Sequence, residues 1–426
     1  MTQVESPGWN WAGNLRYRAA RLHHPQTLDE LRAIVAQSHR LHALGSRHSF
    51  NDVADCDADL VSLDRMPHAL TIDLERRTAT VGAGITYAQL CPELHRAGFA
   101  LHNLASLPHI SVAGAVATAT HGSGDGNGNL ATAVSAIMLV TSEGDLVTFS
   151  RERDGERFYG AVVALGALGV VVRVILNLLP TFEVRQRIYR RLPMAQIEAH
   201  FDAIMGSAYS VSLFTDWQSD FVDQVWLKQR VGDPAPDAGS DFFGAVPATQ
   251  PQHPIETLPA EPCTTQMGVA GPWHERLPHF RPDHVPSVGD ELQSEYFVPR
   301  RFAVEAMRAV AALRDHLAPA LLISEVRTVA ADRLWLSPCY DCACVGLHFT
   351  WKKDWPTVQR VLPLIEAALA PFEPRPHWGK LFTLPPDQLR ARYPRLADFR
   401  ALARDLDPHG KFWNAFLDRL FHGASV

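Results

Sequence analysis

Apolar and polar residues alternate along the first part of the chain in two ways, one typical of helices and one typical of short strands. A helix is predicted after Thr27, because apolar residues then recur at helical spacing at Leu28, Leu31, Ile34 and Val35. Glu30 stands three residues after Thr27, as in an N-terminal capping box. Short apolar strands are predicted on either side of this helix, the second over residues 41–44. The chain therefore opens with a β-α-β unit.

The same pattern predicts a series of further elements. Strands are expected at residues 60–63, 69–73, 78–81, 99–101, 134–140, 146–149 and 168–176, and helices at residues 88–97 and 158–166. Beyond Pro180 the composition shifts towards proline and aromatic residues, so a domain boundary is predicted near residue 182. Residues 232–288 are rich in proline and should be irregular. Helices follow at residues 302–317 and 358–369.

Two predicted strands near the end of the chain carry polar residues on one face only. In residues 322–329, Glu325 and Arg327 share a face, because side chains alternate along a strand. In residues 342–351, His348 and Thr350 share a face, and the opposite face is apolar. These residues could line one polar cavity, or they could form an exposed sheet face with an incidental ion pair. The pattern alone leaves both interpretations open.

A glycine- and serine-containing loop follows the strand predicted at residues 41–44. It reads Leu-Gly-Ser-Arg-His-Ser-Phe-Asn over residues 44–51. Backbone N–H groups left open at the end of a strand can bind an anion such as a pyrophosphate. His48 stands inside this loop, where its imidazole could meet the bound group. A turn with a solvated histidine explains the loop alone equally well.

A run of small residues, 111–120, forms the second informative stretch. Small side chains allow close approach to another backbone or to a flat ligand, and hydroxyls for ring edges or phosphates come from Ser106, Ser111, Thr118 and Thr120. The glycine-rich residues 122–129 follow a helix instead of joining a strand to a helix, so their order excludes a Rossmann fingerprint. The phosphate-binding pattern Gly-x₄-Gly-Lys-[Ser/Thr] is absent.

Composition narrows the class of protein. The 426 residues are 46% hydrophobic and 20% charged, which suffices for two folded domains. A net charge of −6 argues against nucleic-acid binding. The first residues lack the features of a secretion signal, and no apolar run approaches the roughly 20 residues that span a bilayer. Six scattered cysteines form no disulfide framework, and the group Cys339, Cys342 and Cys344 lacks a second ligand pair for zinc. A cytoplasmic location and no metal are expected.

Several motifs together resemble the vanillyl-alcohol-oxidase-type FAD flavoproteins. The motifs lie at residues 45–51, 105–114, 120–124, 324–328, 348–351 and 376–380, and they span essentially the whole chain. Within that superfamily the chain is most similar to the bacterial alditol oxidases, also called xylitol oxidases. The resemblance implies an α+β fold with a PCMH-type FAD-binding domain of two α/β subdomains. This domain would comprise residues 1–182, with 377–426 returning to it, and an α+β substrate (cap) domain would be inserted at residues 183–376.

The resemblance also implies a cofactor site. His48 matches the histidine that is bonded covalently to the 8α carbon of FAD, and its loop would hold the pyrophosphate. The residues implied to bind FAD are Gly45, Ser46, Arg47, His48, Ser49, Ser106, Ser111, Gly114, Thr118, Ala119, Thr120, His121, Val170 and His377. Ala105 lies where members of this family tune the access of oxygen to the flavin.

By the same resemblance, the substrate would be bound by Ser106, Glu325, Arg327, His348, Thr350 and Lys380. Lys380 and Arg327 are cations that would stabilise charge developing on an alkoxide. Glu325 or His348 would orient hydroxyls or accept a proton, and the residue types do not decide between them. A polyol needs several fixed donors and acceptors for its recognition, which suits this set.

The expected activity is FAD-dependent oxidation of the terminal hydroxyl of alditols such as xylitol and sorbitol. The product would be the aldose, and O₂ would be reduced to H₂O₂. The expected partners are a polyol and O₂, without nucleic acid or membrane, and the family suggests a monomer. One alternative is an aldono-1,4-lactone oxidase or dehydrogenase on the same fold. Another is a flavin-free sugar-binding protein that uses the polar strand face.

Overall fold

The first elements of the structure form where the hydrophobic pattern predicts them. This computed structural model describes residues 4–234, 241–284 and 290–422. Helix α1 (Leu28–Gln37) follows Thr27, whose hydroxyl accepts the backbone N–H of Glu30 at 3.2 Å. The Glu30 carboxylate accepts the backbone N–H of Gln26, one residue earlier than a capping box requires. The predicted start of the helix is confirmed.

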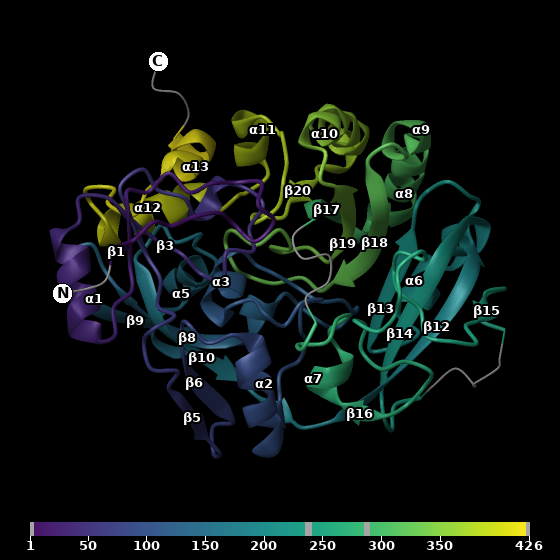
Figure 1. Ribbon diagram of the computed structural model, residues 1–426, viewed down its shortest axis with the longest axis horizontal. Coiled ribbons are helices and arrows are strands. Elements are labelled where there is room, and N and C mark those ends of the chain that lie inside the picture. Colours follow the sequence, from purple (N-terminus) through teal and green to yellow (C-terminus); the bar gives the residue numbers. More distant parts are fainter. Residues whose placement is uncertain (1–3, 235–240, 285–289, 423–426) are drawn as a thin grey trace.

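Two main sheets are built from the N-terminal part of the chain (Figure 1). The first contains parallel pairs and has the order β1 (Val4–Glu5), β2 (Arg21–His23), β4 (Asp59–Val61), β3 (Leu41–Ala43). The second is antiparallel and has the order β5 (Leu70–Asp73), β6 (Thr78–Gly82), β10 (Val170–Asn177), β8 (Val134–Val140), β9 (Leu146–Ser150). A short pair joins β7 (Phe99–Ala100) and β11 (Leu179–Pro180). The helices of this part are α2 (Tyr87–Arg96), α3 (Val112–Ala117), α4 (Arg151–Asp154) and α5 (Glu156–Val162).

A nine-stranded antiparallel sheet follows in the chain. Its order is β15 (Val246–Pro247), β12 (Glu183–Pro193), β14 (Phe221–Arg230), β13 (Ser210–Thr215), β18 (Leu321–Val329), β19 (Cys344–Lys352), β17 (Glu291–Pro299), β20 (Arg375–Pro376). The remaining strand, β16 (Gly271–Pro272), pairs with β12. Strands β18, β19 and β17 therefore lie side by side in one half of the sheet and bring residues from distant parts of the chain together.

One face of the large sheet is covered by helices (Figure 1). These are α6 (Met194–Met205), α8 (Ala303–Ala311) and α10 (Trp355–Leu369). Leu347, Phe349 and Trp351 of β19 are buried in the same core as α10, as the apolar alternation predicts. The prediction of a single helix at residues 302–317 is wrong. A turn at Leu313 divides this segment into α8 and α9 (Arg314–Leu317), and Leu317 in α9 is fully buried.

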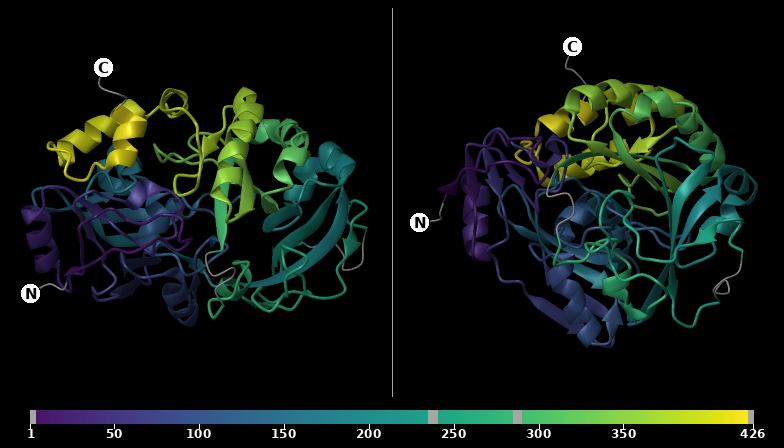
Figure 2. Two further views of the ribbon diagram at one scale, coloured as in Figure 1. Left: turned by 45° about the horizontal axis from the view of Figure 1, so that its top comes forward. Right: turned by 45° about the vertical axis from the view of Figure 1, so that its right-hand side comes forward.

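The C-terminal segment packs against the N-terminal part of the chain, and Figure 2 shows the two lying side by side. Its helices are α11 (Pro386–Ala391), α12 (Leu396–Leu406) and α13 (Ala415–Leu417). The Asn414 amide donates to the backbone carbonyls of Val53 and Asp55, and α12 contacts α5. On these contacts we propose the division expected from the resemblance, with a flavin domain at 1–182 and 377–426 and a substrate domain at 183–376.

The proline-rich segment is irregular, as predicted, over the part that the structure describes. Between residues 241 and 284 its only regular elements are short, namely β15, β16 and α7 (Trp273–Arg276). The backbone N–H groups of His279 and Phe280 both donate to the carbonyl of Ser106 at 3.2 Å, which ties this segment to the flavin domain. Within the described ranges, no helix combines the length and the apolar character that crossing a membrane requires.

Candidate active site

A cavity of about 440 Å³ lies between the N-terminal sheets and the uncovered face of the large sheet. Such a volume is typical of small-molecule sites. Its lining brings together residues from the loop after β3, from α3 and from strands β17, β18 and β19 of the large sheet. The predicted residues on this lining are Gly45, Ser46, Arg47, His48, Ser49, Ser106, Ser111, Gly114, Thr118, Thr120, His121, Glu325, Arg327, His348, Thr350, His377 and Lys380.

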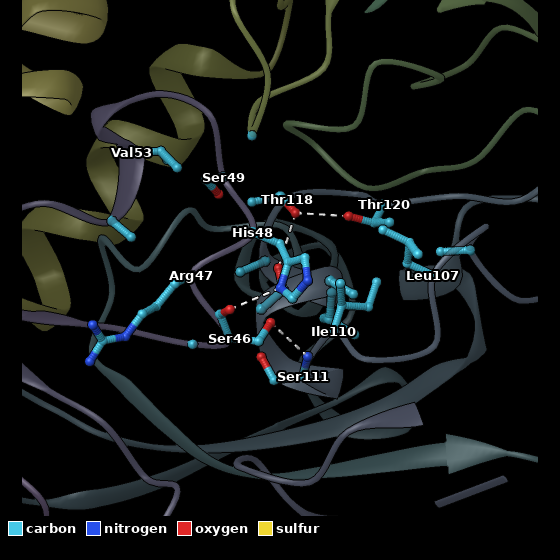
Figure 3. Close-up of a pocket in the computed structure, with 18 of the residues that line it drawn as sticks. Ser46, Arg47, His48, Ser49, Val53, Leu107, Ile110, Ser111, Thr118 and Thr120 are labelled. Carbon is cyan, nitrogen blue, oxygen red and sulfur yellow. Dashed lines mark hydrogen bonds between the residues drawn. The ribbon is translucent and has the colours of Figure 1, made fainter. Parts of the chain in front are cut away.

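At the end of the cavity near β3, the backbone of the loop after β3 lies close to the backbone at the start of α3. The Ser46 hydroxyl accepts the backbone N–H of Ser111 at 3.0 Å, as Figure 3 shows. A Cβ atom on Gly45 or Gly114 would come within 2.8 or 2.7 Å of the Ser111 hydroxyl, so a side chain at either position would have to displace that hydroxyl. That hydroxyl is buried and has no hydrogen-bond partner in the described part of the chain. A buried donor that lacks a partner, beside a glycine cradle, fits a polar group such as the pyrophosphate of FAD.

His48 is held in this loop as a neutral imidazole. Its Nδ1 atom lies 2.8 Å from the carbonyl of Ser46, which can only accept, so Nδ1 carries the proton and Nε2 is free of one (Figure 3). Burial lowers the pKa of His48 to about 4. Its ring stacks on Trp11 with centroids 5.3 Å apart, a contact that the sequence does not signal. An unprotonated ring nitrogen is therefore available at neutral pH.

Arg47 adopts a backbone conformation that favours glycine, with a φ of 63°. Its guanidinium extends away from His48 in Figure 3, donates to the carbonyl of Pro7 and lies over the ring of Tyr17. These contacts help to hold the turn that presents His48 to the cavity.

Two of the expected flavin contacts are absent from the cavity lining among the described residues. Val170 is fully buried and packs with Leu41 and Val140, while its strand neighbour Val171 lines the cavity because alternate side chains face opposite sides. Ala119 has a φ of 52° and lies in the main core, whereas Thr118 and Thr120 line the cavity.

Glu295 is the centre of the polar wall at the other end of the cavity. Its carboxylate accepts from Lys380 Nζ at 2.7 Å and Arg327 Nη2 at 2.8 Å, and His121 Nε2 lies 3.1 Å away. The side chain is fully buried. Burial opposes its charge, but Lys380 and Arg327 outweigh this effect and hold the pKa of Glu295 well below its usual range. The wall therefore contains an ionised carboxylate between two cations.

Glu325 lies beside this group. One carboxylate oxygen accepts from His279 Nε2 at 2.7 Å, and the other lies 3.5 Å from Arg327 Nε. Burial raises the pKa of Glu325, but the charge of Arg327 and the contact with His279 bring it far below its usual range. Glu325 is thus an ionised hydrogen-bond acceptor on the lining.

His348 is fixed in one tautomer by a chain of side chains. The Gln293 amide donates to Glu291 at 2.5 Å, so its oxygen accepts from His348 Nε2 at 3.1 Å. Burial and the charge of Lys380 lower the pKa of His348 well below its usual value, so the ring is neutral. Because His348 is only 8% exposed and Glu325 only 3%, the interpretation as an exposed sheet face is wrong.

Sequence reasoning missed several residues of this wall. Glu291, Gln293 and Glu295 alternate along β17 and share one face, so the period-two argument used for β18 would also have found them. His279 stands in the irregular segment, and Lys228 lies near the C-terminal end of β14. Neither of these two residues carries a pattern that predicts its place beside Glu325.

Ligand atoms of His121, Glu295 and His377 lie within 4.8 Å of one another, close enough to hold a metal ion. Two cationic side chains already share the carboxylate of Glu295. A further cation there would meet strong repulsion. The arrangement favours an internal ion network, and we assign no metal to it.

Comparison with known proteins agrees with this geometry. The family model described as FAD binding domain matches residues 19–150, and that of D-arabinono-1,4-lactone oxidase matches residues 290–420. An alditol oxidase from Streptomyces sp. (strain IKD472 / FERM P-14339) is 52% identical over 97% of this chain and 99% of its own. L-gulonolactone oxidase from Bos taurus is 25% identical over 97% of this chain and 98% of its own. The structure of cholesterol oxidase from B. sterolicum superimposes with a TM-score of 0.79 at 14% identity, covering 99% of this chain and 97% of that one.

The fold and the flavin-domain match define an FAD-dependent oxidoreductase with a PCMH-type flavin domain, and the expected α+β fold is confirmed. The lactone oxidases are more distant relatives, at about half the identity of the alditol oxidase. Similarity over nearly the full length of both proteins narrows the class further, and the chain belongs to the alditol oxidase family.

Proposed function

We propose that the protein oxidises the terminal hydroxyl of alditols, such as xylitol and sorbitol, to the aldose, with O₂ reduced to H₂O₂. The observation that carries this proposal is the polar wall of the cavity, where Glu325, His348 and Thr350 lie beside two cations. A polyol carries hydroxyls along its chain, and its recognition needs several fixed donors and acceptors. The 52% identity to an alditol oxidase supports the same substrate class.

The residues of this wall have complementary tasks. Lys380 and Arg327, both held by Glu295, stabilise charge that develops on the substrate oxygen as its proton leaves. Glu325 accepts hydrogen bonds from substrate hydroxyls because its carboxylate stays ionised. His348 carries its proton on Nε2, so its Nδ1 is also an acceptor. The substrate is thereby fixed by charged and neutral partners together.

The residues around Ser111 and Gly114 would hold the cofactor. FAD held there would supply the redox chemistry, as the acceptor of the hydride from the alcohol carbon and the donor of electrons to O₂. We propose that the pyrophosphate of FAD lies against Ser46, Ser111 and Gly114 and that His48 is bonded covalently to the 8α carbon of the flavin. The support for the link is a partly buried, neutral imidazole with an unprotonated Nε2 inside the predicted flavin loop.

The covalent link makes a direct prediction. Acid-precipitated wild-type protein should stay yellow and fluorescent, whereas His48→Ala should release its flavin to the supernatant, because the variant has no ring nitrogen to bond. Flavin absorbance in pellet and supernatant measures the difference. His109→Ala is the matched control, because His109 is outside the cavity lining and its Nε2–H donates to the carbonyl of Pro282 at 2.8 Å. Flavin lost from the wild-type pellet would contradict the link.

A lactone is the second candidate substrate, because the D-arabinono-1,4-lactone oxidase model matches residues 290–420. Peroxide production by the purified protein with xylitol, and separately with an aldono-1,4-lactone, distinguishes the two candidates. We expect xylitol-dependent H₂O₂ at a higher kcat/KM than with the lactone. Turnover of the lactone alone would overturn the proposal.

A further inference from the structure

Lys228 is a buried cation next to the polar wall of the cavity. It lies near the C-terminal end of β14 and is only 1% exposed. Its Nζ atom lies 2.5 Å from the carbonyl of Leu277, 3.0 Å from that of Pro278 and 2.9 Å from His279 Nδ1. An ammonium has three N–H donors and no acceptor. Three acceptors therefore account for all three of its protons.

The opposite side of the imidazole fixes where the protons lie. His279 Nε2 is 2.7 Å from the Glu325 carboxylate, which only accepts, so Nε2 must carry a proton. In the alternative arrangement, Lys228 is a neutral amine and accepts a hydrogen bond from His279 Nδ1–H. A neutral imidazole carries only one N–H, so Nε2 would then face the Glu325 carboxylate without a proton. Burial lowers the pKa of Lys228 to about 7, whereas burial and the charge of Lys228 lower that of His279 to about 4. The shared proton therefore lies on Lys228.

His279 also connects two of the proposed substrate residues. Its side chain holds one oxygen of Glu325, and its backbone N–H donates to the carbonyl of Ser106 at 3.2 Å. Both Ser106 and Glu325 line the cavity. The position of His279 therefore sets the separation between a hydroxyl on the flavin-domain side and a carboxylate on the large sheet.

We propose that Lys228 and His279 are positioning residues for alditol binding: Lys228 holds His279 in its Nε2–H tautomer, and His279 presents the Glu325 carboxylate to a substrate hydroxyl. This inference rests on the proposed function. It assigns a role to a buried lysine that the reaction itself does not require. Neither residue contacts the reacting carbon in this role, because each acts through Glu325.

The arrangement makes alditol affinity depend on pH. Charged and titratable groups around Lys228 are Glu325 and Cys263, which favour its charged form, and Arg327, which opposes it. Above a pH of about 7 the amine keeps two N–H donors, for which His279 Nδ1 competes with the carbonyls of Leu277 and Pro278, so the hold on His279 weakens. His279 then no longer holds Glu325 in one orientation. The KM for an alditol should rise as the pH increases through about 7.

The test measures kcat and KM for xylitol on the flavin-loaded protein. Lys228→Met and His279→Leu should raise KM by about 10- to 100-fold, the equivalent of a lost hydrogen bond to a charged group, with a smaller effect on kcat. His279→Gln should recover most of the affinity, because its amide N–H occupies the place of Nε2–H. Lys411→Met is the matched control. Lys411 Nζ also donates to two backbone carbonyls, those of Val35 and Ser142, but it lies outside the cavity lining.

The outcomes separate the inference from the function on which it rests. Wild-type turnover of xylitol is measured first, so a wrong substrate is recognised before any variant is compared. A wild-type KM that stays constant on both sides of pH 7 would overturn the inference, and this measurement needs no variant to fold. If His279→Gln has a KM for xylitol no lower than that of His279→Leu, His279 has a role in packing alone. If Lys228→Met keeps the wild-type KM and its pH dependence, this result also contradicts the inference.

Discussion

Lys380→Met should lower kcat/KM for xylitol by about 10²- to 10³-fold, the usual cost of removing one group that stabilises a developing oxyanion. Lys380 lines the cavity, and its Nζ atom is 2.7 Å from Glu295. Methionine keeps the length and apolar stem of the side chain but removes the charge. Glu295 still accepts from Arg327, so the ion network keeps a cation and the protein should fold.

Steady-state peroxide production measures this change, and flavin absorbance confirms that the cofactor is loaded. The matched control is Lys352→Met, which removes an exposed lysine on β19 whose Nζ atom donates to the carbonyl of Pro319. That variant should keep the wild-type kcat/KM. Equal activity of Lys380→Met and Lys352→Met would show that the Lys380 charge has no part in the reaction.

Glu295→Gln should destabilise the folded protein by about 3–5 kcal/mol at neutral pH, the typical cost of removing one partner of a buried ion pair. The variant leaves Lys380 and Arg327 buried with no carboxylate between them. Denaturant unfolding of the flavin-loaded protein, followed by circular dichroism, gives the change in the free energy of unfolding. Glu198→Gln is the control, because Glu198 pairs with Arg308 on the exposed surface.

The same variant has a predicted pH dependence. The pKa of Glu295 is held well below its usual value, so its ionisation stabilises the folded state above the unfolded pKa of about 4.3. That contribution is lost as the pH falls towards the folded pKa. The difference between wild type and Glu295→Gln should therefore be complete at neutral pH and should narrow in acid. A constant difference across this range would mean that Glu295 acts by shape and not by charge.

Local patterns predicted most elements of the N-terminal part and, in the large sheet, strands β18 and β19, but not β12, β13, β14 or β17. The alternation in β18 and β19 placed Glu325, Arg327, His348 and Thr350 on shared faces, because a strand has a fixed period of two. Whether that face was exposed could not be decided locally, since burial depends on the flavin domain that lies across the cavity. The same limit applies to Val170, whose neighbour Val171 faces the cavity instead.

Contacts between distant segments could not be predicted in this way. Lys228 and His279 are 51 residues apart, and no periodicity relates a residue of β14 to one in an irregular segment. Trp11 lies against His48 because its backbone N–H donates to the carbonyl of Arg47 at 2.9 Å, a contact between distant loops. Glu295 differs from Lys228, His279 and Trp11, because the alternation of Glu291, Gln293 and Glu295 is visible in the sequence. That this polar face belongs to the site depends on the pairing of its strand, β17, with β19.

The loop that contains His48 is fastened directly to the turn that contains Lys380. The Asn51 amide donates to the backbone carbonyls of Trp378 and Lys380, and the backbone N–H of Phe50 donates to that of Gly379. The two segments are separated by more than 300 residues in the chain, yet these hydrogen bonds to the backbone join them directly. Enzyme engineering has to treat them as one module. A loop grafted from a relative without its matching turn would displace Lys380 from the proposed substrate site, and selection for a new substrate at that turn would disturb the loop that contains His48.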